Sequence, residues 1–255
     1  MVSYVFWIWY FIGAVLLTLF TVPESLQFSN GIFLVLYAAY AMDVLKKGAS
    51  QSLVSDQSVI TAYRLPLWVS AVVLWTGGMT AEWIGVHTGK LFGSYVYTDI
   101  LGPLLYGVPV TLGFAWIAVV YNAVLITRNF GLSGGMLMVV RALQVGLWIV
   151  ILDLVLDPVA HARGFWLWSG GEGLYGVPWS NFAGWFMVGA FLSSCFHNVR
   201  VSERAVILGT RLYQAILVLF GLMGLREGLP LCTVIAGAGA LLAEGSLRYA
   251  GSPQT

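Results

Sequence analysis

The amino-acid sequence predicts an all-α polytopic membrane protein, with about eight transmembrane helices and an internal parallel repeat of helical hairpins. The first observation behind this prediction is composition: 59% of the 255 residues are hydrophobic, only 9% are charged, and the mean hydropathy is +0.87. A soluble globular protein averages about 45–50% apolar and about 25% charged residues. This chain therefore has too few polar groups to cover a water-facing surface. The other two observations are a series of long apolar segments and a residue pattern that occurs twice.

Eight segments are apolar enough, and nearly long enough, to cross a bilayer. A span needs about 20 apolar residues, because each helical residue rises about 1.5 Å through a hydrocarbon core about 30 Å thick. The segments are approximately Tyr4–Phe20, Gly31–Leu45, Leu65–Val86, Leu104–Ile126, Met136–Leu156, Asn181–Phe196, Ala205–Leu225 and Leu229–Leu247. The second is short, so seven spans is the alternative. The first lacks a basic region and a small-residue cleavage site, so we expect a retained helix rather than a signal peptide.

The distribution of Lys and Arg predicts how the chain lies in the membrane. With eight spans, nine basic residues fall on one side, and three, Lys90, Arg163 and Arg226, fall on the other. The nine are Lys46, Lys47, Arg64, Arg128, Arg141, Arg200, Arg204, Arg211 and Arg248. An excess of basic residues marks the cytoplasmic side, so we expect an integral protein of the inner or plasma membrane with both termini cytoplasmic. The basic residues are scattered and the net charge is +1, which gives no indication of a nucleic-acid partner.

The middle of the chain contains one residue pattern twice. The first copy is Glu82, Gly93, Tyr95-Val-Tyr97, Gly107-Val-Pro109 and Trp116, and the second is Asp153, Gly164, Trp166-Leu-Trp168, Gly176-Val-Pro178 and Trp185. In both copies 11 residues separate the acid from the glycine, 13 separate the acid from the first aromatic residue, and 7 separate the proline from the later tryptophan. Five matches in register indicate a duplication.

Each copy predicts a helical hairpin, in which a helix ends near a carboxylate, an aromatic loop follows, and a second helix begins at a proline. Proline suits the first turn of a helix, where its missing N–H costs nothing. Two spans per copy preserve the orientation, so the repeat is parallel and both carboxylates lie near the extracytoplasmic side. The expected bounds are residues 1–255 for a single membrane domain, about 65–130 and 136–200 for the repeat units, and 1–47 and 205–248 for the outer helices.

Three acids within or next to these helices are the candidate catalytic residues: Glu82, Asp153 and Asp157. A charged group in an apolar helix is costly unless it is paired or hydrated, and such residues are often functional. Asp153 and Asp157 are four residues apart and therefore share one helix face. Asn181 follows Pro178 at the same level. Most of the 11 Trp and 12 Tyr have a simpler interpretation, because aromatic residues at span ends usually anchor a helix in the bilayer interface.

Four stretches of the sequence carry a resemblance to a known family. They are Glu82-Trp-Ile-Gly-Val-His-Thr-Gly-Lys-Leu-Phe-Gly-Ser-Tyr-Val-Tyr-Thr, Asp153-Leu-Val-Leu-Asp-Pro-Val-Ala, Gly164-Phe-Trp-Leu-Trp and Tyr175-Gly-Val-Pro-Trp-Ser-Asn-Phe-Ala-Gly-Trp185. In these stretches the chain resembles the integral-membrane carotenoid 1,2-hydratases, which include bacterial γ-carotene 1',2'-hydratases and archaeal bisanhydrobacterioruberin hydratases. The resemblance covers about residues 65 to 185.

This resemblance implies a carotenoid biosynthesis enzyme that protonates the terminal double bond of an acyclic carotenoid ψ end and adds water to give a tertiary alcohol. Asp153 or Asp157 would be the proton donor, because desolvation favours the neutral form of a carboxylic acid, and Glu82 would orient the water. The implied substrate-binding residues are Asn181, which could hold the water, and a set of aromatic residues whose faces can stabilise a cation: Tyr95, Tyr97, Trp166, Trp168, Tyr175, Trp185 and Trp116.

The same reaction needs neither a metal nor an organic cofactor. The implied partners are a lipid-soluble carotenoid, the lipid bilayer and other carotenoid enzymes. If the two hairpins converge, we expect the three acids and their aromatic neighbours to line one apolar cavity that opens laterally to lipid.

Three alternatives remain open. A lycopene-type cyclase starts with the same protonation. A Mg-dependent membrane prenyltransferase or terpene synthase would use the Asp153–Asp157 spacing for metal and diphosphate, although Pro158 is expected to interrupt that helix and no second Asp-rich motif is present. A small transporter is the third alternative, because parallel repeats and carboxylates in spans are common in transporters.

Overall fold

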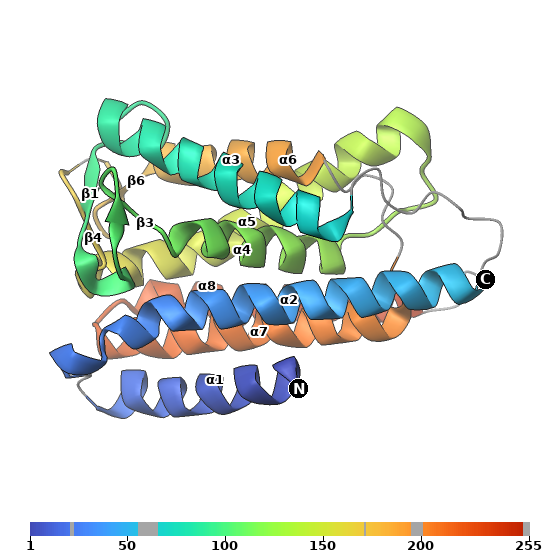
Figure 1. Ribbon diagram of the computed structural model, residues 1–255, viewed down its shortest axis with the longest axis horizontal. Coiled ribbons are helices and arrows are strands. Elements are labelled where there is room, and N and C mark those ends of the chain that lie inside the picture. Colours follow the sequence, from blue (N-terminus) through green and yellow to red (C-terminus); the bar gives the residue numbers. More distant parts are fainter. Residues whose placement is uncertain (21–22, 56–65, 171, 195–200, 252–255) are drawn as a thin grey trace.

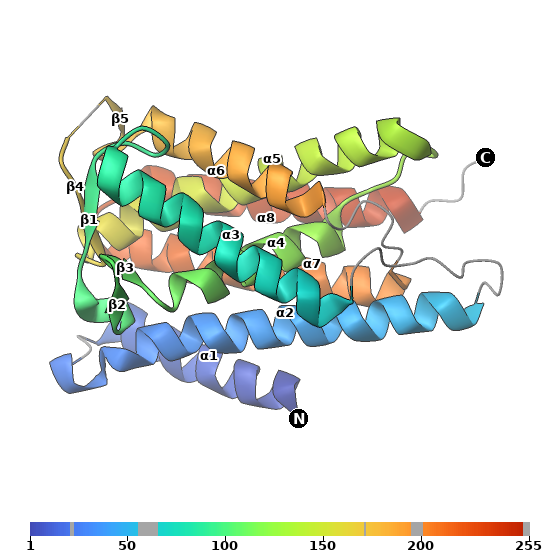
Figure 2. The same ribbon diagram turned by 45° about the horizontal axis from the view of Figure 1, so that its top comes forward.

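The computed structural model describes residues 1–20, 23–55, 66–170, 172–194 and 201–251, and in this part of the chain eight α-helices form one bundle (Figures 1 and 2). The helices are α1 Val2–Leu19, α2 Phe28–Ser55, α3 Leu67–Thr88, α4 Leu112–Ile126, α5 Gly134–Ala162, α6 Trp179–Ser193, α7 Glu203–Arg226 and α8 Pro230–Gly251. Two 3₁₀ turns, η1 Glu24–Leu26 and η2 Asp99–Leu101, lie between helices. Arg64, Arg200 and Cys195 lie outside the described residues.

Six of the described helices are long and apolar enough to cross a bilayer, namely α1, α2, α3, α5, α7 and α8. This is the pattern of an integral membrane protein. The second helix is 28 residues long, so its expected shortness is wrong. The short helices are instead α4 and α6, with 15 residues each. Fifteen residues rise only about 22 Å, which is less than the hydrocarbon thickness.

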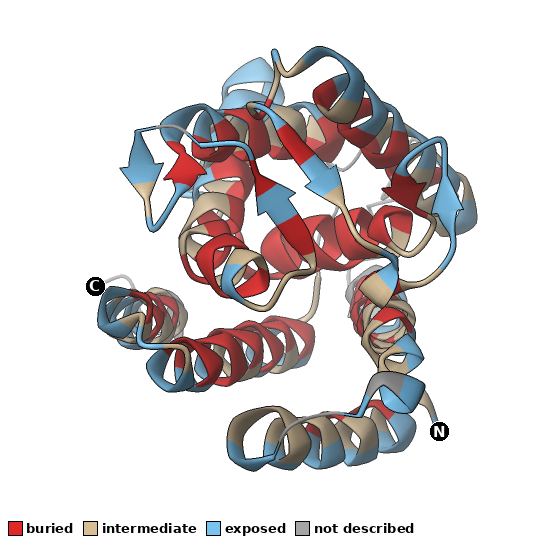
Figure 3. Cartoon of the chain, turned by 90° about the vertical axis from the view of Figure 1, so that its left-hand side faces the viewer, coloured by how far each residue is buried: buried red, intermediate tan, exposed pale blue. Residues whose placement is uncertain are grey.

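Helix α4 lies at the centre of the bundle, although it is short. Every residue of α4 except Phe114 is buried, and the helix contacts α2, α3, α5, α6, α7 and α8. A helix that is apolar on all sides belongs in such a core. Helix α1 is the opposite case, because its contacts are with α2 and, to a smaller extent, α7, and it lies at the edge of the bundle (Figure 3).

Six short strands lie in the described loops: β1 Tyr95–Tyr97, β2 Leu104–Leu105, β3 Val108–Pro109, β4 Trp166–Trp168, β5 Gly173–Leu174 and β6 Val177–Pro178. They gather at one end of the bundle, and both chain termini point away from that end (Figure 1). Strands β1 and β4 pair antiparallel, with Val96 opposite Leu167 at the centre. This ladder ties the two aromatic loops together across the end of the bundle.

The hairpins β2–β3 and β5–β6 correct the expected start of the fourth span at Leu104. Their two-residue turns, Tyr106-Gly107 and Tyr175-Gly176, have positive φ angles of 48° and 82° in the first and 50° and 85° in the second. Such angles fit a type I′ turn, which joins strands and cannot continue a helix. The helix therefore begins only at Leu112.

Helix α5 continues past Pro158 to Ala162, so the expected interruption at this proline is wrong. Proline lacks the N–H that would bond to the carbonyl of residue 154. The thiol of Cys232 on α8 lies 3.8 Å from that Leu154 oxygen and supplies a weak replacement donor. Asp157 consequently stays in regular helix.

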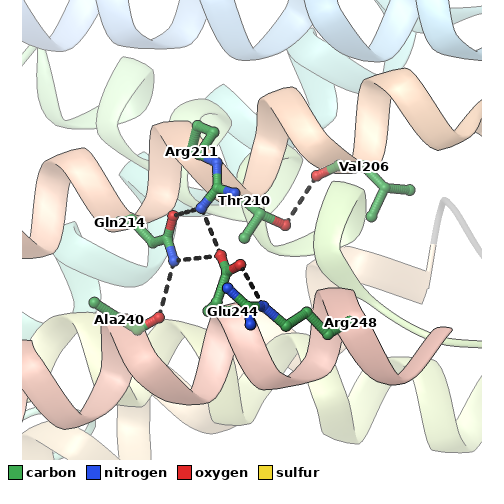
Figure 4. Close-up of polar contacts among 7 residues, drawn as sticks. All are labelled: Val206, Thr210, Arg211, Gln214, Ala240, Glu244 and Arg248. Atoms are coloured by element: carbon green, nitrogen blue, oxygen red, sulfur yellow. Dashed lines mark hydrogen bonds and ion pairs between the residues drawn. The ribbon is translucent and has the colours of Figure 1, made fainter. Parts of the chain in front are cut away.

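A polar network joins α7 and α8 in the half of the bundle nearer the C-terminus (Figure 4). Glu244 accepts hydrogen bonds from Arg211 at 2.5 Å and from Arg248 at 2.9 Å. Gln214 donates to the Ala240 carbonyl at 3.0 Å and to Glu244 at 3.3 Å. Glu244 on α8 is thereby paired with Arg211 on α7 and with Arg248 on its own helix.

Candidate active site

Glu82 on α3 is buried and accepts hydrogen bonds at both carboxylate oxygens. Its side chain is 1% exposed. The hydroxyls of Tyr95 and Tyr97 each donate to Oε2 at 2.7 Å, and the indole Nε1 of Trp116 donates to Oε1 at 3.0 Å. Both carboxylate oxygens are therefore occupied by donors from β1 and α4.

A second buried cluster lies on α5 and α6, where Asp153, Asp157 and Asn181 meet. The amide Nδ2 of Asn181 donates to Asp153 Oδ2 at 2.9 Å and also to Asp157 Oδ2. The indole of Trp166 donates to Asp157 Oδ1. Both aspartates are 1% exposed. One amide thus bridges two carboxyl groups in a site that water barely reaches.

The two aspartates differ in one respect. Both oxygens of Asp157 accept hydrogen bonds. By contrast, Asp153 Oδ1 and the Nε1 of Trp168 are the two buried side-chain polar atoms in the described residues that have no hydrogen-bond partner. A buried polar atom without a partner is costly and calls for an explanation, and at a candidate active site it marks a place for a reacting group or a water molecule.

Left-handed glycines direct both aromatic loops back onto the acids. Helix α3 ends at Thr88, and Gly89 has a φ of 65°. After α5, Gly164 has a φ of 72° and the N–H of Phe165 bonds to the Ala160 carbonyl at 2.9 Å. Glycine adopts this conformation without a steric cost and commonly ends helices. The strands that follow therefore pass over the ends of α3 and α5.

Because side chains alternate between the two faces of a strand, the aromatic side chains of the strands point toward the acids. Residues two apart in a strand point to the same face, so Tyr95 and Tyr97 both reach Glu82, whereas Val96 between them is exposed. Across the β1–β4 ladder, the Tyr95 and Trp168 rings lie 4.6 Å apart, and the Tyr97 and Trp166 rings 5.6 Å apart. The two acid clusters are thus joined through a single aromatic layer.

Tryptophans make a second connection deeper in the bundle. The indoles of Trp116 and Trp185 stack at 4.4 Å, with an angle of 19° between their planes. Gly78 on α3 leaves the space that the Trp116 indole occupies, because a Cβ at this position would collide with the ring. The sequence therefore fixes Trp116 between Glu82 and Trp185.

The hydroxyls of Tyr95 and Tyr97 remain protonated donors. Burial raises the pKa of both groups well above the ordinary value, and the charge of Glu82 raises it further. The charge of Asp157 has a smaller effect on both pKa values in the same direction, so the two acid clusters interact electrostatically.

Ten of the eleven residues expected at the site belong to the two acid clusters or to the aromatic contacts that join them. The exception is Tyr175, which is 37% exposed and occupies the left-handed turn position between β5 and β6. Its hydroxyl accepts a hydrogen bond from the Leu231 N–H at 3.2 Å, away from the acids.

The expected cavity differs from the observed one. An apolar cavity lies beside the site, lined by Trp166 and Trp185 but by none of the three carboxyl groups. The reason is that the tyrosines, tryptophans and Asn181 cover the acids. Sequence reasoning also missed Asn122, a lone amide in an apolar helix that accepts from the Tyr37 hydroxyl and donates to the Gly209 carbonyl, both at 2.8 Å.

Over the described ranges, no group of three or more His, Cys, Asp or Glu side chains is arranged to hold a metal ion. His197 lies outside those ranges.

Comparison with known proteins assigns the family. The chain is 33% identical over 169 residues to a bisanhydrobacterioruberin hydratase from Haloarcula japonica, an alignment that covers 66% of this chain and 54% of that protein. The chain thus spans about half the length of this curated relative. No solved structure matches the chain. The profile described as "carotenoid biosynthesis protein" matches residues 31–242, and the chain therefore belongs to the carotenoid biosynthesis protein family.

Proposed function

We propose that this protein is a carotenoid 1,2-hydratase, which adds water across the terminal double bond of an acyclic carotenoid end. The family supports a carotenoid substrate, and the hydratase among its relatives supports hydration. The observation that carries the proposal is the buried Asp153–Asn181–Asp157 group, because it leaves one carboxyl oxygen without a partner beneath an aromatic layer.

The hydrogen bonds favour Asp153 as the proton donor. Two carboxyl groups joined by one amide in a low-dielectric site cannot both be ionised, because like charges repel strongly there. Donors stabilise the charged form, and Asp157 accepts from Trp166 and Asn181 on both oxygens. The shared proton therefore belongs on Asp153, at the oxygen that no other group occupies.

In the proposed reaction, the aspartate pair both supplies the proton and takes one back. Asp153 gives its proton to C2 of the terminal double bond, whose π electrons form the new C–H bond, and the positive charge falls on the tertiary carbon C1. A water oxygen bonds to C1 and releases a proton to the Asp157 carboxylate. The pair begins and ends with one proton, which returns to Asp153 before the next turnover. General acid–base catalysis of this kind contributes about 10²–10⁴-fold to rate.

Aromatic faces stabilise the cation between these two steps. Tyr95, Trp166 and Trp168 form the layer over the aspartates, and each such face contributes about 0.5–2 kcal/mol to binding of a cation. Both oxygens of Glu82 already accept hydrogen bonds, from Tyr95 and Tyr97 at Oε2 and from Trp116 at Oε1. We therefore assign Glu82 a positioning function, in which it holds Tyr95 and Tyr97 in place, instead of the expected water-orienting one.

We also propose that the two hairpins are a parallel repeat related by a rotation about an axis near the membrane normal. The β1–β4 pairing supports this, because Tyr95 opposite Trp168 and Tyr97 opposite Trp166 are the same pair with the copies exchanged. The matching left-handed Tyr-Gly turns of the two β-hairpins support it as well. The repeat units at about 65–130 and 136–200 would then lie within one membrane domain.

The proposed topology has eight crossings, with α4 and α6 crossing as short, central helices. Both termini point away from the strands (Figure 1), which is consistent with an even number of crossings. The basic residues place the termini in the cytoplasm and the acids near the extracytoplasmic side.

Expression in a bacterium that accumulates lycopene or γ-carotene tests the function, with mass analysis of the extracted pigments. A gain of one water supports hydration. An isomeric product of unchanged mass would point to cyclisation, and an unchanged pigment in cells that contain the folded protein would refute both reactions on these substrates. The Asp153→Asn variant is the matched inactive control.

A further inference from the structure

The apolar cavity beside the site is built mainly by helices outside the two hairpins. Its residues on α1 are Trp9, Gly13, Leu16 and Leu17, those on or near α2 run from Ser29 to Tyr37, and those on α7 run from Ile216 to Met223. Helices α4 and α5 and the loop residues Leu101 and Phe165 complete the wall. The lining contains no charged side chain, so the cavity suits a hydrocarbon.

Two indole side chains lie between the cavity and the acid clusters. Trp166 lines the cavity and donates to Asp157. Trp185 also lines it and stacks on Trp116, which donates to Glu82. A molecule in the cavity would therefore touch the same rings that cover the acids.

The shape of the cavity fits one end of a long chain rather than a whole carotenoid. From Ser29 to Tyr37 it follows α2 for eight residues, which corresponds to about 12 Å along a helix. The hydrocarbon core is about 30 Å thick, so the remainder of a long polyene can stay among lipid chains.

We propose that this cavity binds the acyclic polyene segment next to the reacting end, and that α1 forms its outer wall. The proposal rests on the proposed function for the identity of the substrate. It assigns a substrate-binding role to α1, an edge helix that packs mainly on α2 and, to a smaller extent, on α7. The geometry at Gly13 makes the proposal testable, because a Cβ there would meet no atom within 4 Å.

The first experiment fills the cavity with Gly13→Phe. The control is Gly237→Phe on α8, where a Cβ also meets no atom within 4 Å and the residue is exposed. Each protein is purified from lycopene-accumulating cells, and the pigment retained per protein is measured by absorption. We expect Gly13→Phe to retain at least tenfold less total carotenoid, substrate and product together, than wild type, and Gly237→Phe and Asp153→Asn to retain as much as wild type. Normal retention by a folded Gly13→Phe variant would overturn the proposal.

A second experiment keeps the test independent of whether the Phe variant folds. Gly13→Cys adds only a small group in open space, and the introduced thiol is alkylated by an apolar methanethiosulfonate reagent, with wild-type labelling subtracted. We expect bound lycopene to slow this labelling at least tenfold, with no effect on Gly237→Cys. Equal labelling with and without lycopene would overturn the proposal. Because neither experiment measures hydration, a failure of the cavity proposal is distinguishable from a failure of the hydratase proposal.

Discussion

Conversion of each aspartate to asparagine separates the proposed proton donor from its partner. The two residues lie four apart on α5, are equally buried and share Asn181, so the substitutions are closely matched. The proposed mechanism needs a transferable proton on Asp153 and a negative charge on Asp157. Both variants should therefore lose hydration, but for different reasons and with different effects on stability.

The expected magnitudes follow from the hydrogen bonds. In Asp153→Asn the amide oxygen can keep the bond from Asn181, and an unpaired N–H donor replaces the unpaired O–H donor of the protonated acid, so we expect a smaller stability change than in Asp157→Asn. In Asp157→Asn one acceptor oxygen replaces two, and either Trp166 or Asn181 loses its acceptor. An unsatisfied buried donor costs about 1–3 kcal/mol. The loss of activity should be about 10²–10⁴-fold in Asp153→Asn.

The assay measures the rate of lycopene hydration in membranes and the thermal unfolding of the purified variants. Asp99→Asn is the control, because Asp99 is an exposed carboxylate at the same end of the bundle, and it should keep full activity. Full activity in Asp153→Asn would refute the assignment of this residue as donor. Full activity in Asp153→Asn, Asp157→Asn and Glu82→Gln alike would refute the acid mechanism as a whole.

Three further predictions concern other parts of the molecule. Tyr97→Phe removes one of the three donors to buried Glu82, and it should lower stability by about 1.5–3 kcal/mol, measured by thermal unfolding; an unchanged melting temperature would contradict the described contact. Asn122→Leu leaves the buried Tyr37 hydroxyl without its acceptor and removes the side-chain hydrogen bond to the Gly209 carbonyl, so the melting temperature should fall while turnover per folded protein stays the same. Ser169→Cys, at an exposed position beside β4, should react with an impermeant thiol reagent in intact cells, and reaction only after lysis would reverse the proposed topology.

The sequence predicts the acid cluster well because its geometry follows from local spacing. In each copy, the residues between the acid and its aromatic pair form the end of one helix, a turn at a glycine and the start of one strand. The same 13-residue spacing occurs twice, from Glu82 to Tyr95 and from Asp153 to Trp166; Tyr95 reaches Glu82, whereas Trp166 bonds Asp157, one helical turn after Asp153. Asn181 follows for the same reason, since its helix starts directly after the loop.

The short hairpins could not be distinguished from helix by hydropathy. Residues Leu104, Leu105, Val108 and Val110 form an apolar run, and a short apolar run is compatible with either a strand or a helix. The sequence does contain one signal for these turns, which is the Tyr-Gly pair before each Val-Pro. A glycine in a two-residue turn favours the type I′ conformation. Both pairs have positive φ angles in the structure.

The cavity could not be predicted from the sequence, for a different reason. Residues such as Gly13 and Leu16 on α1 have the composition of a lipid-facing surface, and only the packing of α1 across α2 and α7 turns that surface inward. The proposed catalytic residues therefore lie in the hairpins, whereas most of the cavity wall comes from α1, α2 and α7. Because the family match begins at residue 31, α1 falls outside it. A change in α1 can consequently alter which polyene fits while the hydrogen bonds of Asp153, Asp157 and Glu82 remain as they are.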